Sequence, residues 1–208
     1  ISATASGRSS YALTAWIDSA GAPIFDQPAT MRTPAKTSRA TVVTLTEAGE
    51  AQRSLRKSGV PVLIVFEGWD AAGKGTAIGR LAQAFDPRGF TVHHIHPVSE
   101  PESFYPPMHR FWTRLPIRGN IAIFNHSWYR QVLDEAVDKQ RLVPQLRKAY
   151  ERIRVFERQL MDDGAVIVKF FLHISKEEQR RRLQARLDDP AKRWKFSRDD
   201  LKEREYWN

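Results

Sequence analysis

The fold is decided by one stretch, Pro61-Val62-Leu63-Ile64-Val65-Phe66-Glu67-Gly68-Trp69-Asp70-Ala71-Ala72-Gly73-Lys74-Gly75-Thr76. It opens with a continuous apolar run, residues 62–66, whose β-branched composition predicts a strand buried on both faces. A loop punctuated by glycine follows, and over residues 76–85 apolar side chains recur at helical spacing. A strand, a glycine-rich loop and a helix in this order are the context that a phosphate-binding loop requires.

The loop itself has the composition of an anion-binding site. Gly68 and Gly73 permit backbone turns that a Cβ atom would block, so that successive N–H groups can point inward at the start of a helix. Lys74 adds a mobile cation that can follow a phosphate group during transfer. The residues predicted to bind phosphate or nucleotide here are Gly68, Trp69, Ala71, Ala72, Gly73, Lys74, Gly75 and Thr76. The alternative interpretation is a glycine-rich turn that carries a surface lysine.

The loop follows the pattern G-x-x-x-x-G-K from Gly68 to Lys74 and departs from the usual P-loop at the next position. Gly75 stands where a serine or threonine is usual, and Thr76 comes one residue later. In an ordinary P-loop that hydroxyl group holds Mg²⁺. Asp70, inside the loop, is the nearby carboxylate that could replace the hydroxyl group as a metal ligand.

Length and composition indicate one α/β domain of intracellular type. The chain has 208 residues, which is enough for one such domain with a sizeable core. It contains no cysteine, and no apolar run reaches the length of a membrane span, so we expect a cytoplasmic protein without a membrane partner. The sequence begins at Ile1 without a methionine or a secretory leader, so we also expect that it is not a complete natural product.

The charge balance favours a polyanionic partner, which could be nucleic acid, a nucleotide, inorganic polyphosphate or an anionic surface, because the net charge is +9 and the pI is about 10. Between residues 176 and 198 there are nine lysine or arginine residues and four acidic residues. This segment suits a lid that closes on a polyanion, although by itself it also fits a solvated basic helix face. Nucleic acid is not an expected partner, because the sequence contains no recognised nucleic-acid-binding module.

The remaining elements are predicted from hydrophobic periodicity, caps and breakers. Residues 1–46 predict an irregular arm, in which residues 11–17 and 41–45 have the composition to become ordered. Helices are predicted at 47–57, 103–115, 127–138, 144–162, 176–187 and 197–207, and further strands at 90–96, 120–124 and 165–172. Ser127 and Ser175 are predicted to cap the helices that follow them.

A polar cluster follows the strand predicted at 120–124, and it begins with Asn125 and His126. The position just past the carboxyl end of a buried strand is where open α/β sheets place ligands. Phosphotransferases commonly have a metal-binding carboxylate at this point. Asn125 can offer only a neutral oxygen in its place.

Three histidines lie on or beside the strand predicted at 90–96. His94 and His96 share one face of that strand, and His93 points to the other face. Two histidines without a nearby carboxylate make a weak metal site, so residues at the edge of a pocket are the favoured interpretation.

The helix predicted at 103–115 carries both basic and aromatic residues. Arg110 and Arg114 lie one turn apart and could face a phosphate chain, so Arg114 is a candidate phosphate ligand. The aromatic residues are predicted to belong to the core; they are Phe104, Tyr105, Phe111 and Trp112.

Six ordered stretches carry recognisable motifs. They are Gly68-Trp69-Asp70-Ala71-Ala72-Gly73-Lys74-Gly75, Asp86-Pro87-Arg88-Gly89-Phe90, Arg110-Phe111-Trp112 with Leu115-Pro116, Ile123-Phe124-Asn125-His126-Ser127-Trp128-Tyr129, Phe170-Phe171-Leu172-His173-Ile174-Ser175-Lys176-Glu177-Glu178-Gln179, and Asp189-Pro190-Ala191-Lys192-Arg193-Trp194-Lys195-Phe196-Ser197. At this spacing they resemble the successive signatures of the polyphosphate kinase 2 family over residues 47–208.

The resemblance implies an α/β fold, namely a P-loop kinase-like three-layer α/β/α sandwich with a central parallel sheet and a helical lid at about residues 175–205. It implies a phosphotransferase that moves a phosphoryl group between inorganic polyphosphate and AMP or ADP, with Mg²⁺ as cofactor. The family is commonly oligomeric, so a homo-oligomer is expected.

The resemblance also assigns roles to residues that match the family's motifs. It implies that Lys74 holds the phosphates in flight and that Asp70 and Asn125 bind Mg²⁺. Arg182 and Arg186, one turn apart on the lid helix, would reach over the transferred phosphoryl group. The polyphosphate path would continue along Lys192 and Lys195.

Two departures from the family bear on activity. His126 stands where the family usually has arginine, and a neutral imidazole would supply less positive charge to the transition state. The sequence ends at Asn208, just after the lid, so the final part of the family domain is expected to be missing. The alternatives are therefore a catalytically weakened domain with a binding or structural role, and an ATP-dependent nucleotide kinase.

Overall fold

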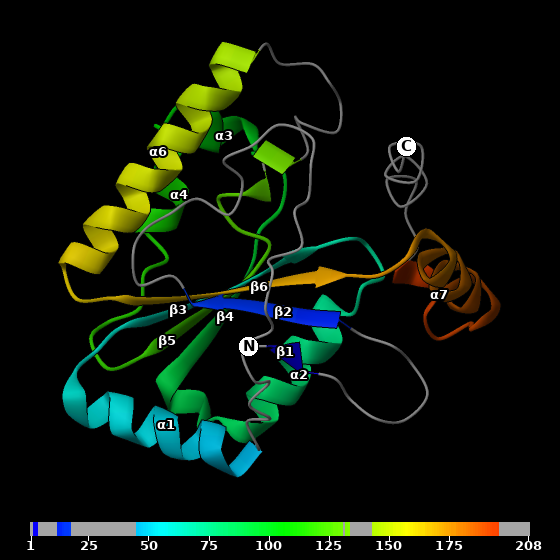
Figure 1. Cartoon of the computed structure of the whole chain (residues 1–208), viewed down its shortest axis with the longest axis horizontal. Helices are drawn as coiled ribbons and strands as arrows, with labels where there is room; N and C mark the ends of the chain where they lie inside the picture. Colours follow the sequence, from blue (N-terminus) through cyan, green and yellow to red (C-terminus); the bar gives the residue numbers. More distant parts are fainter. Residues whose placement is uncertain (1, 4–11, 18–44, 131, 134–142, 196–208) are drawn as a thin grey trace.

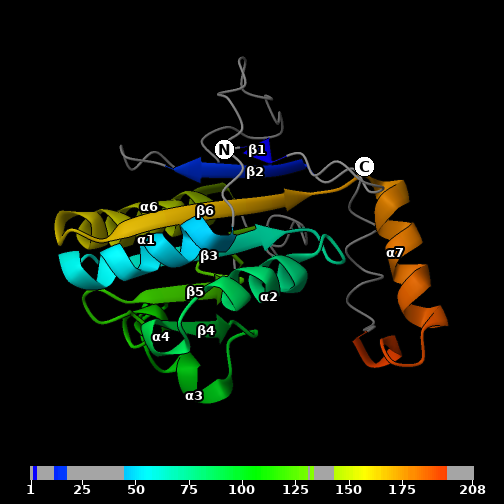
Figure 2. The same ribbon diagram turned by 90° about the horizontal axis from the view of Figure 1, so that it is seen from below.

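A six-stranded sheet with the strand order β1-β2-β6-β3-β5-β4 organises the chain, as the computed structural model in Figure 1 shows. The structure describes residues 2–3, 12–17, 45–130, 132–133 and 143–195. Figure 2 shows the strands in sequence from β1 and β2 at one edge to β4 at the other.

The centre of the sheet is parallel. β3 (Val62–Gly68) lies between β6 (Val166–His173) and β5 (Ile121–Asn125), and β4 (Phe90–His94) pairs with the outer side of β5. Every residue of β3 from Val62 to Glu67 is buried, as the apolar run predicted. The predicted α/β fold with a parallel central sheet is confirmed, and all four carboxyl ends meet at one end of the molecule.

Two short strands from the first residues extend the sheet. β2 (Ala12–Ile17) pairs antiparallel with β6, and β1 (Ser2–Ala3) pairs antiparallel with β2. The sheet is therefore mixed, with an antiparallel edge on a parallel centre. Residues 11–17 were expected to have ordering potential, and β2 coincides with most of them. The rest of the predicted irregular arm lies almost entirely outside the described residues.

Helices cover both faces of the sheet and make the three layers (Figure 1). α1 (Leu45–Ser58) and α2 (Lys74–Ala84) lie on one face, and α6 (Val143–Asp162) lies on the other with the short α3 (Glu100–Ser103) and α4 (His109–Trp112). Side chains of β3 alternate between two cores. Leu63 and Val65 pack toward the α6 side, whereas Ile64 and Phe66 pack toward the α2 side.

The single helix predicted at 103–115 is wrong. The structure has α3 and α4 there, separated by Pro106 and Pro107, which have no N–H group to donate and exclude a continuous helix. The prediction that its aromatic residues are all core is also wrong, since Phe104 is 82% exposed and Tyr105 is 55% exposed. Phe111 is buried as predicted.

The chain leaves β6 at the carboxyl end of the sheet and enters α7 (Lys176–Asp188), which stands beyond that end in Figure 2. Ser175 caps α7 as predicted, because its side-chain oxygen accepts a hydrogen bond from the backbone N–H of Glu178. The helix predicted at 197–207 and most of the one predicted at 127–138 lie outside the described residues. None of the helices in the described part combines the length and the apolar composition that a membrane span needs.

Candidate active site

The loop that the sequence predicts to bind phosphate, residues 68–75 (the phosphate loop below), leaves β3 through a glycine that no other residue could replace. Gly68 has φ of +123°, and a Cβ atom there would lie 2.1 Å from the carbonyl oxygen of Leu172 on β6. Ala71 has φ of +60° and Gly73, the N-cap of α2, has φ of +103°. These left-handed residues wind the loop tightly around the amino end of α2.

Lys74 lies across the mouth of this loop. Its Nζ donates to the carbonyl oxygens of Gly68 (2.7 Å) and Trp69 (3.1 Å) and lies 3.7 Å from Oδ1 of Asp70. The residue is only 8% exposed, so its ammonium group is held where the loop closes. A bound phosphate group would compete for this ammonium group with the two carbonyl oxygens.

The other loop residues take three kinds of position. Ala71 and Ala72 are buried under the loop, whereas Gly75 and Thr76 are exposed on the first turn of α2. Trp69 is half-buried, and its Nε1 donates to Nδ1 of His173 at the end of β6 (2.9 Å). The loop is thus attached to the neighbouring strand on one side and open on the other.

The carboxyl end of β5 brings Asn125 beside β3 and β4. In the sheet, Asn125 is the partner of Phe66 on β3 and of His94 on β4. Its Nδ2 lies 2.9 Å from Nδ1 of His94. Its Oδ1 is buried and has no hydrogen-bond partner in the described part of the chain, which makes it an oxygen available to a cation.

His126 follows with a left-handed backbone, φ +62°. Its N–H donates to the carbonyl oxygen of Phe66 (3.0 Å), and its Nδ1 lies 3.3 Å from Oε2 of Glu67. Such a conformation costs a non-glycine residue about 1–3 kcal/mol and persists only where the surroundings impose it. The surroundings here include Glu67, a residue that our sequence analysis did not single out.

Glu67 is the last buried residue of β3 and is 5% exposed. Its Oε1 accepts hydrogen bonds from both the backbone N–H and the Oγ of Ser127, each 2.7 Å long. A sequence signal for it exists, because a glutamate inside an apolar strand is buried only when it has partners.

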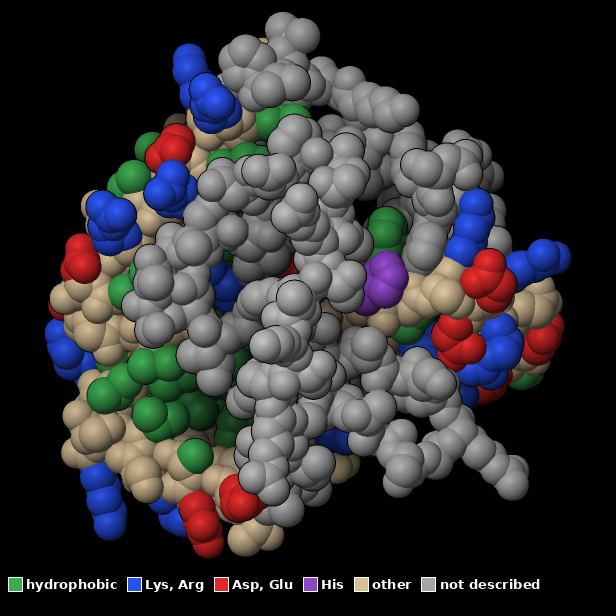
Figure 3. Space-filling model, in the orientation of Figure 1, with side chains coloured by type: hydrophobic (Ala, Val, Ile, Leu, Met, Phe, Trp, Pro, Cys, Tyr) green, Lys and Arg blue, Asp and Glu red, His purple; other side chains and the backbone are tan. Residues whose placement is uncertain are grey.

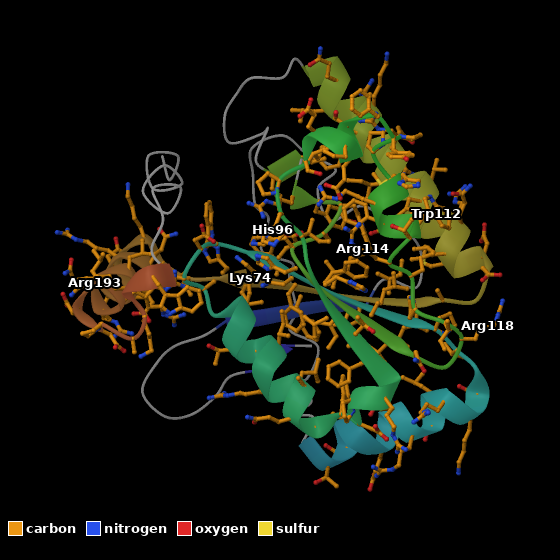
Figure 4. The ribbon with its side chains drawn as sticks, turned by 180° about the vertical axis from the view of Figure 1, so that it is seen from behind. Lys74, His96, Trp112, Arg114, Arg118 and Arg193 are labelled. Carbon is orange, nitrogen blue, oxygen red and sulfur yellow. The ribbon has the colours of Figure 1, made fainter. Side chains whose placement is uncertain are left out.

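Histidine rings gather at this end of the sheet. The ring of His94 lies 4.4 Å from that of His96 and 6.3 Å from that of His126, measured between ring centroids. Burial lowers the pKa of His94, and electrostatic interaction with the neighbouring imidazoles, first His96 and then His126, lowers it further. Across the described residues there is no cluster of three or more His, Cys, Asp or Glu side chains that could hold a metal ion. Figure 4 shows His96 and Lys74 at the same end of the sheet.

His93 predicts a pH dependence of stability. Its ring packs 5.2 Å from that of Phe124, and burial, followed by the charge of Arg114, lowers its pKa below 6.5. The unfolded chain therefore takes up the proton first, so the free energy of unfolding should fall as the pH drops through 6.5 and level off below the folded-state pKa. Urea unfolding at a series of pH values measures this. The variant His93→Gln should show a shallower fall, and an unchanged slope would contradict the assignment.

α7 is fastened to the phosphate loop by two side chains. Gln179 is fully buried, and its Nε2 donates to the carbonyl oxygen of Asp70 (3.2 Å). Nη1 of Arg182 donates to the carbonyl oxygens of Ala71 and Ala72, each at 3.1 Å. The basic helix thus starts directly beside the loop, which places Arg182 at the site, and sequence reasoning missed Gln179.

The other predicted lid residues lie farther along the chain. Arg186 is half-buried, one turn beyond Arg182, and Lys192 is exposed with its Nζ 2.6 Å from Oδ2 of Asp189. Lys195 belongs to η2 (Arg193–Lys195), and its side chain lies outside the described part. Figure 3 shows lysine and arginine side chains interspersed with acidic ones on the part of the surface where α7 lies in Figure 1.

Arg114, the other predicted phosphate ligand, lies farther from α7 than His96 and Lys74 do (Figure 4). It and Arg110 both approach Oε1 of Glu102, at 3.5 Å and 3.4 Å. Arg110 also donates through Nη2 to the carbonyl oxygen of His96 (2.9 Å). Glu102 thus holds both guanidinium groups, and Glu102 and Arg110 line a cavity.

The cavity has a volume of about 330 Å³ and opens between the α3–α4 segment and the turn after β5. Its lining includes His96, Tyr105, His109, Arg110, Trp128 and Arg130. The rings of Tyr105 and His109 are stacked, with centroids 4.3 Å apart. Nη1 of Arg130 donates to the carbonyl oxygen of Ile95 (2.7 Å). Aromatic and cationic groups therefore share one hollow beside the histidines.

The sequence matches known proteins over most of its length. The family model described as polyphosphate kinase 2 matches residues 33–208. The chain is 41% identical over 155 residues to the polyphosphate:AMP phosphotransferase of Pseudomonas syringae pv. tomato, covering 74% of this chain and 31% of that protein. It is 44% identical over 149 residues to the AMP/ADP-polyphosphate phosphotransferase of Meiothermus ruber, covering 71% and 55%.

A solved structure is also similar to this chain. The crystal structure of polyphosphate kinase 2 from Arthrobacter aurescens TC1 superposes with a TM-score of 0.72 at 34% identity, covering 77% of this chain and 58% of that one. The chain thus spans less than two thirds of each of these proteins. The chain belongs to the polyphosphate kinase 2 family.

Proposed function

We propose that this protein transfers a phosphoryl group between inorganic polyphosphate and AMP or ADP. The observation that carries the proposal is the meeting of the phosphate loop, Lys74 and the basic helix α7 at one end of the sheet. The matched relatives named as polyphosphate phosphotransferases support it. Phosphoryl transfer depends mainly on positioning and on stabilising negative charge, and this end of the molecule supplies both.

The phosphate-binding roles follow from the contacts. The backbone N–H groups of the loop and the ammonium group of Lys74 would hold the phosphates at the transfer point. Arg182 would stabilise the transferred group after exchanging its bonds to loop carbonyl oxygens for phosphate oxygens, with Arg186 one turn away. Lys192 and Lys195 would guide the polyphosphate chain away from the site.

A divalent metal is general to phosphotransferases of this kind, and we propose Mg²⁺ held by Asp70 and Asn125. The residues fit, because Asn125 Oδ1 is a buried oxygen without a hydrogen-bond partner among the described residues and Asp70 supplies a carboxylate. Mg²⁺ prefers oxygen ligands and is commonly held by one or two protein groups together with water and phosphates. When bound, the ion would neutralise charge on the phosphate oxygens.

The acceptor nucleotide would occupy the cavity of about 330 Å³. The stacked rings of Tyr105 and His109 offer an aromatic face, and Arg110 and Arg130 supply cationic groups to the same lining. We propose further that the protein works in the cytoplasm as a homo-oligomer, where nucleotides and polyphosphate meet.

The metal assignment predicts the result of a single substitution. Asn125→Asp replaces a neutral oxygen by a charged one, so the Mg²⁺ concentration for half-maximal activity should fall about 10-fold. Chelation by EDTA should abolish transfer in both forms. The measurement is initial rate against Mg²⁺ concentration at fixed polyphosphate and ADP, with Asn120→Asp at the far end of β5 as the control. Equal Mg²⁺ requirements in wild type and Asn125→Asp would contradict the role of Asn125.

The proposed function is tested by supplying one phosphoryl donor at a time. Purified protein with AMP or ADP, Mg²⁺ and polyphosphate should form the next higher nucleotide, whereas ATP as sole donor should give little transfer. Transfer from ATP alone would favour a nucleotide kinase. No transfer from either donor, restored by His126→Arg, would favour a catalytically weakened domain with a binding or structural role.

A further inference from the structure

One buried carboxylate joins the two loops of the site. Glu67 precedes Gly68, the first residue of the phosphate loop, and its side chain reaches across to the turn after β5. It accepts hydrogen bonds from the N–H and Oγ of Ser127 and lies 3.3 Å from Nδ1 of His126. It has no opening to substrate, since it is 5% exposed.

The turn after β5 (residues 125–129) is held at two points. Glu67 holds its first half, next to Asn125. Glu157 on α6, 2% exposed, holds its second half by accepting hydrogen bonds from Nε1 of Trp128 and from the hydroxyl group of Tyr129, each 2.8 Å long. Nζ of Lys169 lies 2.7 Å from Glu157 Oε2, which balances that buried charge. Both carboxylates are thus buried, and each holds different residues of the turn.

Only the first anchor connects the turn to the phosphate loop. The main chain of Glu67 continues directly into Gly68, whereas Glu157 and Lys169 lie in the core on the α6 side of the sheet. The first anchor also acts on the residue with the unfavourable backbone, His126 at φ +62°. A change in the length of the Glu67 side chain is therefore expected to shift Asn125 and His126 relative to Lys74, whereas the contacts of Glu157 with the turn are made to Trp128 and Tyr129.

We propose that Glu67 is a positioning residue for phosphoryl transfer. Its carboxylate sets the distance between the phosphate loop and the oxygen of Asn125 by holding Ser127 and the left-handed His126. This inference rests on the proposed function for its effect on turnover. It differs from a charge effect of Glu67, because it depends on the length of the side chain and on its two acceptor oxygens.

Two variants separate length from charge. Glu67→Asp keeps the charge and shortens the side chain by one methylene group, so the bonds to Ser127 are broken or stretched. Glu67→Gln keeps the length and an oxygen that can accept from Ser127, and removes the charge. Glu157→Asp is the matched control, since it makes the same shortening at the other buried anchor of the same turn.

We expect kcat to be highest in the wild type, lower in Glu67→Gln and lowest in Glu67→Asp. Glu67→Asp should lose about 10- to 100-fold, which is usual for groups that orient a ligand, and its KM for polyphosphate should stay within about 3-fold. Glu157→Asp should lower the melting temperature by at least as much and keep kcat within about 3-fold of wild type. If Glu67→Asp does not fold, Ser127→Ala removes the Oγ hydrogen bond to Glu67, keeps the one from the backbone N–H, and should lower kcat by about 10-fold.

Two readouts need no turnover, so failure of this inference can be told from failure of the proposed function. Amide hydrogen exchange at Ser127 should accelerate in Glu67→Asp and stay slow in Glu67→Gln and Glu157→Asp. The affinity of the protein for Mn²⁺ with ADP, followed by electron paramagnetic resonance, should weaken about 10-fold in Glu67→Asp. The inference is overturned if the kcat of Glu67→Asp equals or exceeds that of Glu67→Gln. It is also overturned if Glu67→Asp and Glu157→Asp lose kcat to the same extent. Unchanged exchange and Mn²⁺ affinity in Glu67→Asp overturn it even without turnover.

Discussion

Replacing Lys74 by methionine is expected to lower the rate of phosphoryl transfer from polyphosphate by ~10³-fold. The ammonium group is the cation that the phosphate loop holds at its mouth, through the carbonyl oxygens of Gly68 and Trp69 and beside Asp70. Methionine keeps the buried stem of the side chain and removes the charge, so the fold should persist while the stabilisation of the transferred group is lost. The measurement is the initial rate with polyphosphate and ADP, together with the melting temperature.

Lys57→Met provides the matched control, because Lys57 is an exposed residue in the last turn of α1, away from the carboxyl ends of the strands. It removes the same charge from the protein and should keep the rate within about 2-fold. A Lys74→Met protein that remains folded and retains activity within a few-fold of wild type would contradict the role assigned to Lys74.

Replacing Gly68 by alanine is expected to lower the free energy of unfolding by roughly 3–6 kcal/mol and to abolish transfer. Two costs add. The backbone at φ +123° is unfavourable for any residue with a side chain, and the new Cβ atom would lie 2.1 Å from the carbonyl oxygen of Leu172 and 2.7 Å from its N. The atoms that the new Cβ atom meets belong to the backbone of β6, so room for it can arise only if β3 and β6 move apart at this point. Urea denaturation followed by circular dichroism measures the loss.

Gly75→Ala is the control from the same loop. A Cβ atom at Gly75 would meet nothing within 4 Å, and the residue lies in the first turn of α2. Alanine there should leave the free energy of unfolding within about 1 kcal/mol of wild type. Equal stabilities of Gly68→Ala and wild type would show that β3 and β6 are not in contact at this point.

Local patterns predicted the centre of the fold. The apolar run at 62–66 and the glycines after it define β3 and the phosphate loop without reference to distant residues, because burial on both faces and positive φ leave direct marks in a sequence. The same holds for the cap at Ser175. The prediction of one helix at 103–115 was wrong because the helical periodicity was given more weight than the two prolines that interrupt it.

Sequence reasoning proposed only those site residues that belong to sequence motifs. Lys74 and Arg182 both contact the phosphate loop, and Asn125 Oδ1 is buried without a hydrogen-bond partner among the described residues. The residues that hold these groups could not be found in the same way. Glu67 binds Ser127 and Gln179 binds Asp70 across long separations in sequence, and such pairings depend on strand order, which periodicity does not reveal.

The cavity beside Arg110 was missed for a related reason. Its walls come from the α3–α4 segment and from the turn after β5, which are adjacent only because β4 and β5 pair. The glutamate that holds Arg110 and Arg114 is likewise recognised only when the chain is folded. Sequence reasoning placed Arg114 toward a phosphate chain, and the structure places it beside Glu102.

The central claim is that the loop ahead of Lys74 binds the polyphosphate at its transfer point, and a crystal structure of the protein with bound polyphosphate and ADP tests it most directly. The account predicts a phosphate group within hydrogen-bonding distance of the loop N–H groups, with Nζ of Lys74 moved from the carbonyl oxygens of Gly68 and Trp69 onto a phosphate oxygen. Polyphosphate bound elsewhere, with Lys74 still attached to those two carbonyl oxygens, would contradict it.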